Sequence, residues 1–152
     1  MKKLPKHNTQ PNRPRPHYRV LYVEDEDDNW FVTEKHLRRH CRIDRARNDV
    51  EALKLLRNER YDFVLMDIQL SGSTLNGIDL TRRVRSSASP PDGKGTRSDV
   101  PVIFVTAYSA KYSREDLVAA GGDDLVTKPV DFVVLLRFIT TLLRRSWKED
   151  SP

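Results

Sequence analysis

Five short apolar or β-branched runs alternate with five helix-like segments along the sequence, and this alternation restricts the possible folds more than any other feature. The expected strands are Val20–Val23, Arg42–Ala46, Phe63–Met66, Val100–Val105 and Asp124–Thr127. The expected helices are Asp28–His40, a segment that begins at Asp49, Gly77–Arg85, Ser113–Ala120 and Val130–Trp147. Such alternation predicts an α/β fold with a doubly wound parallel sheet, and right-handed crossovers leave few topologies open.

The length and the distribution of charge predict one folded domain with a basic tail. The chain has 152 residues, of which 27 are Lys or Arg and 22 are Asp or Glu. Residues 1–17 contain four prolines and no acid, so we expect a disordered tail there. The domain is expected over residues 18–147 and a short C-terminal tail over 148–152. Six basic residues lie within the first 19 and all acids follow them, so the domain is close to neutral. No nucleic-acid-binding face is therefore expected.

The sequence shows neither a membrane segment nor a disulfide framework. No apolar run approaches the roughly 18 residues that a membrane helix needs. Lys2 and Lys3 are not followed by the apolar stretch of a secretory signal. Cys41 is the single cysteine, so no internal disulfide can form and a buried thiol is expected. We therefore expect a cytoplasmic protein that does not contact a membrane.

Side chains suited to chemistry follow four of the five expected strands. They are Glu24 and Asp25 after the first strand, Asp67 after the third, Thr106 and Ala107 after the fourth, and Thr127, Lys128 and Pro129 at the end of the fifth. The carboxyl ends of parallel strands meet at one edge of the sheet, where folds of this class bind their ligands. Three carboxylates, a hydroxyl and an ammonium are thus expected in one shallow pocket.

This combination of groups predicts an acyl-phosphate site. Three neighbouring carboxylates repel one another unless a cation lies between them, and hard oxygen ligands suit Mg²⁺ (or Mn²⁺). The Lys128 ammonium and the Thr106 hydroxyl are suited to hold phosphate oxygens. A carboxylate beside a metal ion and a lysine is a good phosphoryl acceptor.

The same residues carry a family resemblance. The segments Val20–Asp25 (VLYVED), Val64–Asp67 (VLMD), Val105–Ala107 (VTA) and Thr127–Pro129 (TKP) resemble the signature segments of response-regulator receiver domains of two-component signalling, the family of the chemotaxis regulator. The resemblance covers about residues 18–146. It implies a flavodoxin-like fold of five βα units with strand order 2-1-3-4-5.

The resemblance also implies a role for each site residue. Asp67 would be the phosphoacceptor, and Asp25 and Asp67 would bind the metal ion directly. Glu24 would act on the metal through water, and the backbone carbonyl of Gln69 would supply a further ligand. Thr106 and Lys128 would bind the phosphoryl group, with Ala107 as a further binding position.

Partners follow from the same resemblance. A histidine kinase or a histidine phosphotransfer protein would donate the phosphoryl group, and the output would be binding of a downstream protein. The chain is expected to be a stand-alone regulator, because no output domain follows the matched region before Pro152. It would catalyse only its own phosphorylation and dephosphorylation, so it is not expected to be an enzyme in the usual sense. A homodimer is compatible with these expectations.

Several positions depart from the family pattern. Ser71 stands where Pro is usual, the loop from Ser71 to Asn76 is longer than usual, and residues 86–99 form a long connection. Leu125 stands where the family commonly has Tyr or Phe, so the usual aromatic switch is not expected. The loop from Ala107 to Tyr112 is expected to move instead, with Tyr108 shielding the phosphoryl group from water. The peptide bond before Pro129 is expected to be cis.

Two other readings compete with the receiver. Phosphatases of the haloacid dehalogenase type also use an aspartate at a strand end as nucleophile, but they place a second Asp two residues later. Here that position is Gln69, which cannot act usefully as an acid or base. The other alternative is a degenerate receiver that serves only as a phosphorylation-independent docking module, although every acceptor-site residue is present.

Overall fold

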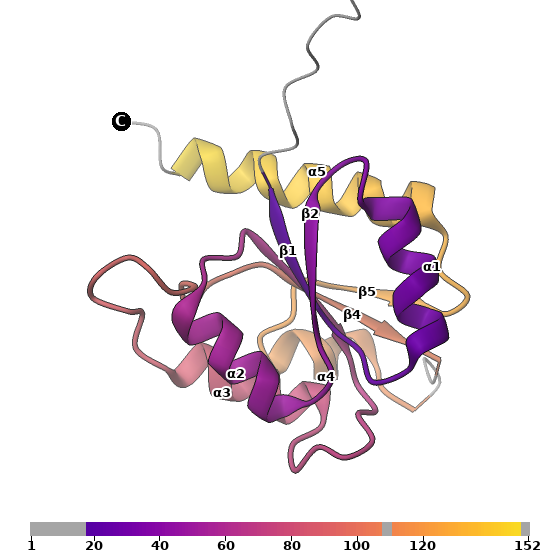
Figure 1. Cartoon of the computed structure of the whole chain (residues 1–152), viewed down its shortest axis with the longest axis horizontal. Coiled ribbons are helices and arrows are strands. Elements are labelled where there is room, and N and C mark those ends of the chain that lie inside the picture. Colours follow the sequence, from indigo (N-terminus) through magenta and orange to yellow (C-terminus); the bar gives the residue numbers. More distant parts are fainter. Residues whose placement is uncertain (1–17, 108–110, 150–152) are drawn as a thin grey trace, which may run out of the picture.

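The computed structural model describes residues 18–107 and 111–149 as five strands that alternate with five helices (Figure 1). The strands are β1 (Arg19–Val23), β2 (Arg42–Ala46), β3 (Phe63–Asp67), β4 (Val102–Thr106) and β5 (Asp124–Thr127). The helices are α1 (Asp27–Leu37), α2 (Asp49–Asn58), α3 (Gly77–Ser86), α4 (Arg114–Ala119) and α5 (Phe132–Glu149). All strand pairs are parallel and the order is β2-β1-β3-β4-β5. The expected α/β fold and strand order are confirmed.

Helices cover both faces of the sheet (Figure 1). Side chains alternate along a strand, so each strand contributes to two separate cores. In β1, Val20 and Tyr22 pack into the core beneath α1 and α5, whereas Leu21 and Val23 pack into the core beneath α2, α3 and α4. This two-sided burial explains why the central strands β3 and β4 are apolar at successive positions and buried throughout.

The edge strand β2 explains the weakest part of the sequence pattern. Only its last residue, Ala46, is buried, and Arg42 at its start is exposed. A strand at the edge pairs with one neighbour and is covered less completely, so polar side chains are tolerated there. The buried Cys41 thiol lies just before β2, and burial raises the pKa of this thiol to about 12.

Two helices differ from their expected bounds by more than one residue. α1 ends at Leu37 rather than His40, because the chain turns there and the N–H groups of His40 and Cys41 both donate to the Leu37 carbonyl. α5 begins at Phe132 rather than Val130, since the carboxylate of Asp131 accepts hydrogen bonds from the first turn of the helix. α5 also continues beyond the expected end at Trp147 to Glu149.

The long connection over residues 86–99 is anchored against the end of α2. Thr96 is buried there, and its hydroxyl donates to the Glu59 carbonyl and accepts from the Tyr61 N–H. The expected tails, except for the last residues of α5, lie outside the described residues. Among the described helices, none combines the length and apolar character needed to cross a bilayer.

Candidate phosphoacceptor site

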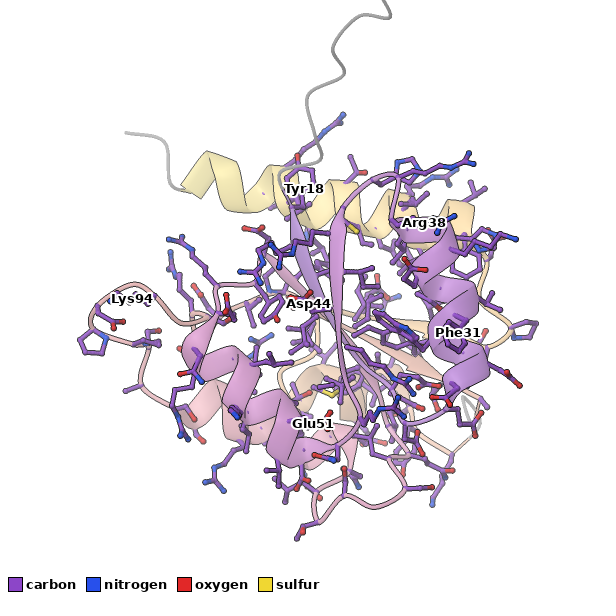
Figure 2. The ribbon with its side chains drawn as sticks, viewed as in Figure 1. Tyr18, Phe31, Arg38, Asp44, Glu51 and Lys94 are labelled. Carbon is purple, nitrogen blue, oxygen red and sulfur yellow. The ribbon has the colours of Figure 1, made fainter. Side chains whose placement is uncertain are left out.

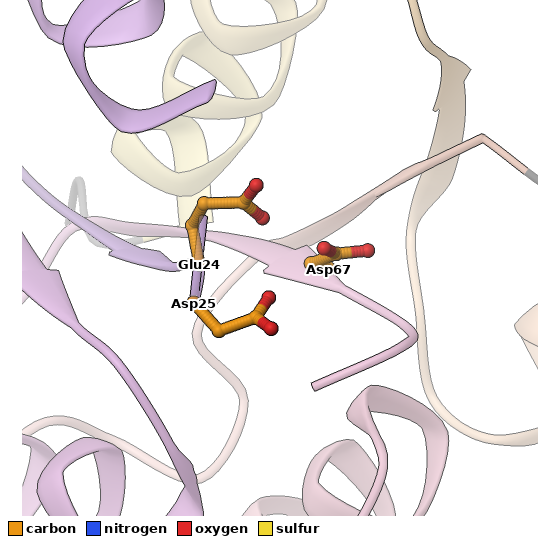
Figure 3. Close-up of side chains that lie close together, drawn as sticks. All are labelled: Glu24, Asp25 and Asp67. Carbon is orange, nitrogen blue, oxygen red and sulfur yellow. The ribbon is translucent and has the colours of Figure 1, made fainter. Parts of the chain in front are cut away.

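Three carboxylates meet at the carboxyl-terminal edge of the sheet. Glu24 and Asp25 follow β1 directly, and Asp67 is the last residue of β3, the strand beside it. One carboxylate oxygen from each residue lies within 4.8 Å of the others. Figure 3 shows the side chains of Glu24 and Asp25 extending toward Asp67. The parallel topology therefore produces the cluster that the sequence pattern predicts.

Lys128 holds two of these carboxylates. Its Nζ lies 3.1 Å from Oδ2 of Asp67 and 3.2 Å from Oε1 of Glu24. The backbone N–H of Lys128 donates to the Thr106 carbonyl, which ties the end of β5 to the end of β4. The Lys128–Pro129 peptide bond is cis, as expected from the sequence.

Burial and charge shift the protonation of this cluster. Glu24 is fully buried, and burial raises the pKa of its carboxyl to about 8, with the neighbouring Asp67 carboxyl adding to the effect. Burial alone would lower the pKa of Lys128, but the carboxylates of Asp67 and Glu24 outweigh it and raise that pKa. Lys128 therefore stays charged and balances part of the negative charge.

The remaining expected site residues lie at the same edge of the sheet. Thr106, the last residue of β4, is buried, and Ala107 beside it is exposed. Gln69 is exposed, two residues beyond Asp67. The role of its backbone carbonyl as a ligand stays a prediction. Tyr108 lies outside the described residues, and its expected shielding role is likewise a prediction.

Sequence reasoning missed how the loop between β3 and α3 is held. The Ser71 N–H donates to Oδ2 of Asp25 at 3.0 Å, so this loop rests directly on the site. Farther along, the Leu75 N–H donates to Oδ2 of Asp49, and the Ser73 hydroxyl accepts from the Asp49 N–H, both at 3.0 Å. Asp49 is the first residue of α2, and the side chain of Asn48 caps this helix by accepting from the Glu51 N–H.

Replacing Asp49 with alanine is expected to lower the free energy of unfolding by about 1–2 kcal/mol, because the Leu75 N–H loses a charged acceptor. Urea denaturation followed by circular dichroism measures the effect. Asp79→Ala is a matched control at an exposed position on α3, where, among the described residues, the carboxylate forms an ion pair with Arg82 alone, and it should cost much less. Equal losses in the two variants would show that Asp49 does not anchor the loop.

Two further contacts fix the backbone around the carboxylates. The Arg45 guanidinium donates from Nε to the Glu24 carbonyl at 2.9 Å and pairs with Asp27 at 2.7 Å. On the other side, the first residue of α3, Gly77, packs against the backbone of Asp67, and its N–H donates to the Ile68 carbonyl. Both contacts act on the main chain, so the pattern of site side chains gives no sign of them.

The comparison with protein families agrees with this geometry. The model of the response regulator receiver domain matches residues 20–140. The chain belongs to the response-regulator receiver family. This membership favours the receiver over a phosphatase of the haloacid dehalogenase type, and it makes the chain part of a two-component signalling system.

Curated relatives of this receiver domain include bacterial transcriptional regulators. The chain is 34% identical over 129 residues to the uncharacterized transcriptional regulatory protein YrkP of Bacillus subtilis. This alignment covers 84% of the chain and 50% of YrkP. It is 36% identical over 127 residues to the transcriptional regulatory protein CseB of Streptomyces coelicolor, covering 83% of the chain and 49% of CseB. The chain thus spans about half the length of the curated relatives it matches.

Solved structures of receiver domains superpose on most of the chain. The receiver domain of the sensor histidine kinase PA1611 from Pseudomonas aeruginosa has a TM-score of 0.69 at 30% identity, over 83% of this chain and 97% of that one. That structure holds a magnesium ion in its active-site cleft. A CheY-like receiver protein from Methanospirillum hungatei has a TM-score of 0.72 at 27% identity, over 87% and 98% of the two chains.

Proposed function

We propose that Asp67 accepts a phosphoryl group with the help of a divalent metal ion, and that this modification switches the domain between two conformations. The observation that carries the proposal is that the side chains of Glu24, Asp25, Asp67 and Lys128 lie close together at the ends of three strands. The complete set of acceptor-site residues favours a phosphorylated switch over a degenerate docking module.

The donor set fits Mg²⁺ or Mn²⁺. All three side chains present hard carboxylate oxygens within 4.8 Å of one another, and such ions take a few protein oxygens and keep several waters. Asp25, Asp67 and the Gln69 carbonyl would hold the ion directly. Glu24 would act through water, because its carboxylate is fully buried and already bound to Lys128. A bound divalent ion would neutralise charge on the phosphoryl oxygens.

The chain's own residues supply the rest of the reaction. An oxygen of the Asp67 carboxylate would attack phosphorus, the bond from phosphorus to the donor would break, and the donor would leave with the bonding electrons. Lys128 already lies 3.1 Å from Asp67, so its ammonium would hold a phosphoryl oxygen after transfer. The Thr106 hydroxyl would hold another.

The proposed donors are a histidine kinase or a histidine phosphotransfer protein, and the proposed output is contact with a downstream protein. Phosphorylation would act by shifting the population between two conformers. The domain would catalyse only its own phosphorylation and dephosphorylation. YrkP and CseB are named transcriptional regulators but are about twice as long as the matched region. Whether a nucleic-acid-binding segment acts together with this domain is therefore a separate question from the chemistry of Asp67.

The direct test is uptake of a phosphoryl group from acetyl phosphate. Intact-mass spectrometry should show one added phosphoryl group when Mg²⁺ is present and none when a chelator replaces it. Addition of the group at an equal rate without a divalent ion would contradict the proposed role of the metal. No addition under any condition, in a folded sample, would support the docking module instead.

The division of roles between the acids predicts unequal effects on metal binding. Asp25→Asn is expected to weaken Mg²⁺ binding by about a hundredfold and Glu24→Gln by about tenfold. The reason is that, of these two acids, Asp25 is taken as a direct ligand and Glu24 as a ligand through water. Trp30 can report the titration, since the Arg45 guanidinium lies 5.8 Å from its ring centre and also binds the Glu24 carbonyl. A Trp147→Phe background removes the second tryptophan. Equal losses in both variants would show that the division is wrong.

A further inference from the structure

A groove of about 620 Å³ lies at the end of the sheet opposite the carboxylates. It is bounded by Tyr18, just before β1, by His40 and Cys41, just before β2, and by the middle of α5. Because all five strands are parallel, residues that precede β1 and β2 are a full strand length from Glu24 and Asp67. The groove is therefore separate from the phosphoacceptor site.

The floor of the groove is aliphatic. Leu136, Ile139 and Leu143 of α5 line it, and Tyr18 and Cys41 close it from the side of the sheet. Leu136 is only partly buried, so part of this apolar surface faces the groove. Apolar surface recessed in this way is suited to receive side chains of a bound segment.

The rim of the groove is strongly basic. His40, Arg137 and Arg144 line it and are exposed. Arg38 and Arg39 precede His40 in the same turn and are exposed too, and Figure 2 shows Arg38 and Tyr18 at the end of the molecule where α5 lies. Within the described part of the chain, none of these four arginines forms an ion pair, and α5 contains no acid before Glu149. The total charge of the domain is near neutral and so gives no sign of this local excess of positive charge.

We propose that this groove binds an acidic peptide segment of a partner protein, with apolar side chains on the aliphatic floor and carboxylates against the arginine rim. Charge complementarity favours such an occupant. The chain's own residues 1–17 are a poor occupant, because they contain five basic residues and no acid.

The shape and chemistry of the groove argue against other anionic ligands. Single-stranded nucleic acids bind to rows of aromatic side chains, whereas the floor here is aliphatic apart from Tyr18. A membrane surface is bound by apolar side chains that protrude from a helix, whereas Ile139 and Leu143 are buried. A peptide that brings its own apolar side chains into the groove matches both the floor and the rim.

Selection from a phage library of short random peptides tests the proposal on the full chain. Enriched sequences should combine Asp or Glu with apolar residues. Fluorescence anisotropy with the enriched peptide should show binding that weakens by about tenfold or more in Arg137→Glu/Arg144→Glu and that weakens as salt is raised. The milder Arg137→Gln/Arg144→Gln protein covers the case in which charge reversal disturbs folding.

Matched controls separate the groove from general electrostatics and from the phosphoacceptor site. Lys54→Glu, an exposed position on α2, should bind the peptide like wild type, and a peptide with its apolar residues replaced by alanine should bind weakly. The arginine variants should still take up a phosphoryl group at Asp67. Enriched peptides without acids, equal binding to the wild-type and arginine-variant proteins, or tighter binding of a DNA duplex or anionic vesicles at the same residues would overturn the proposal.

Discussion

The Asp67→Asn protein is expected to fold like the wild type and to take up no phosphoryl group from acetyl phosphate and Mg²⁺. The amide is nearly the same size as the carboxylate, so the buried end of β3 can keep its packing. An amide oxygen is a poor nucleophile toward phosphorus, and the variant also loses the negative charge that faces Lys128 and a metal ion. Intact mass after incubation measures uptake, and circular dichroism checks the fold.

The control for this prediction is Asp79→Asn, which changes an exposed aspartate of α3 outside the site. That protein should be phosphorylated like the wild type. Stable addition of a phosphoryl group to Asp67→Asn at another residue would remove the central claim. Uptake by the wild type and by Asp79→Asn, but not by Asp67→Asn, would separate a phosphorylated switch from a module that binds its partner without phosphorylation.

The strands that could be predicted best are those with the most uniform surroundings. β3 and β4 are covered on both faces, and their sequences are accordingly apolar at nearly every position. β2 pairs with one neighbour only, so its sequence carried a weaker signal. The ends of helices were harder to place, because the end of α1 depends on a local turn that returns the N–H groups of His40 and Cys41 to Leu37.

The cluster of reactive side chains was predictable for a topological reason. Once the strands are parallel, Glu24, Asp67 and Lys128 must reach the same edge of the sheet, and the structure places them within contact of one another. The supports of the cluster were not predictable in this way. Asp49 and Gly77 act on backbone groups of distant segments, and no spacing in the sequence indicates which N–H or carbonyl a residue will meet.

For the substitution Gly77→Ala, the sequence and the structure predict changes in stability of opposite sign. Replacing a helical glycine with alanine ordinarily stabilises a protein by up to about 1 kcal/mol. Gly77 is the first residue of α3 and does not have a positive φ. Judged from helix propensity alone, Gly77→Ala should therefore be harmless or slightly stabilising.

The structure instead predicts a loss. A Cβ at position 77 would overlap the Asp67 carbonyl oxygen and lie 2.9 Å from the Ile68 Cα. Both are main-chain atoms, so no side-chain rotation relieves the clash, and either α3 or the end of β3 must move. Overpacking typically costs about 1–3 kcal/mol, and a main-chain clash belongs at the upper end of that range. A loss of about 3 kcal/mol corresponds to a fall in Tm of about 10 °C.

The same displacement reaches the phosphoacceptor, because the clash is with the residue that carries the nucleophile. A shift of Asp67 relative to Lys128 and the neighbouring carboxylates is expected to slow phosphorylation by about a hundredfold, measured from the rate of mass increase under conditions where the variant is folded. Gly72→Ala is the matched control: a Cβ there meets open space, and the positive φ of 76° costs only about 1 kcal/mol. A Gly77→Ala protein that is as stable as the wild type and is phosphorylated as fast would show that α3 can move away without carrying Asp67 with it.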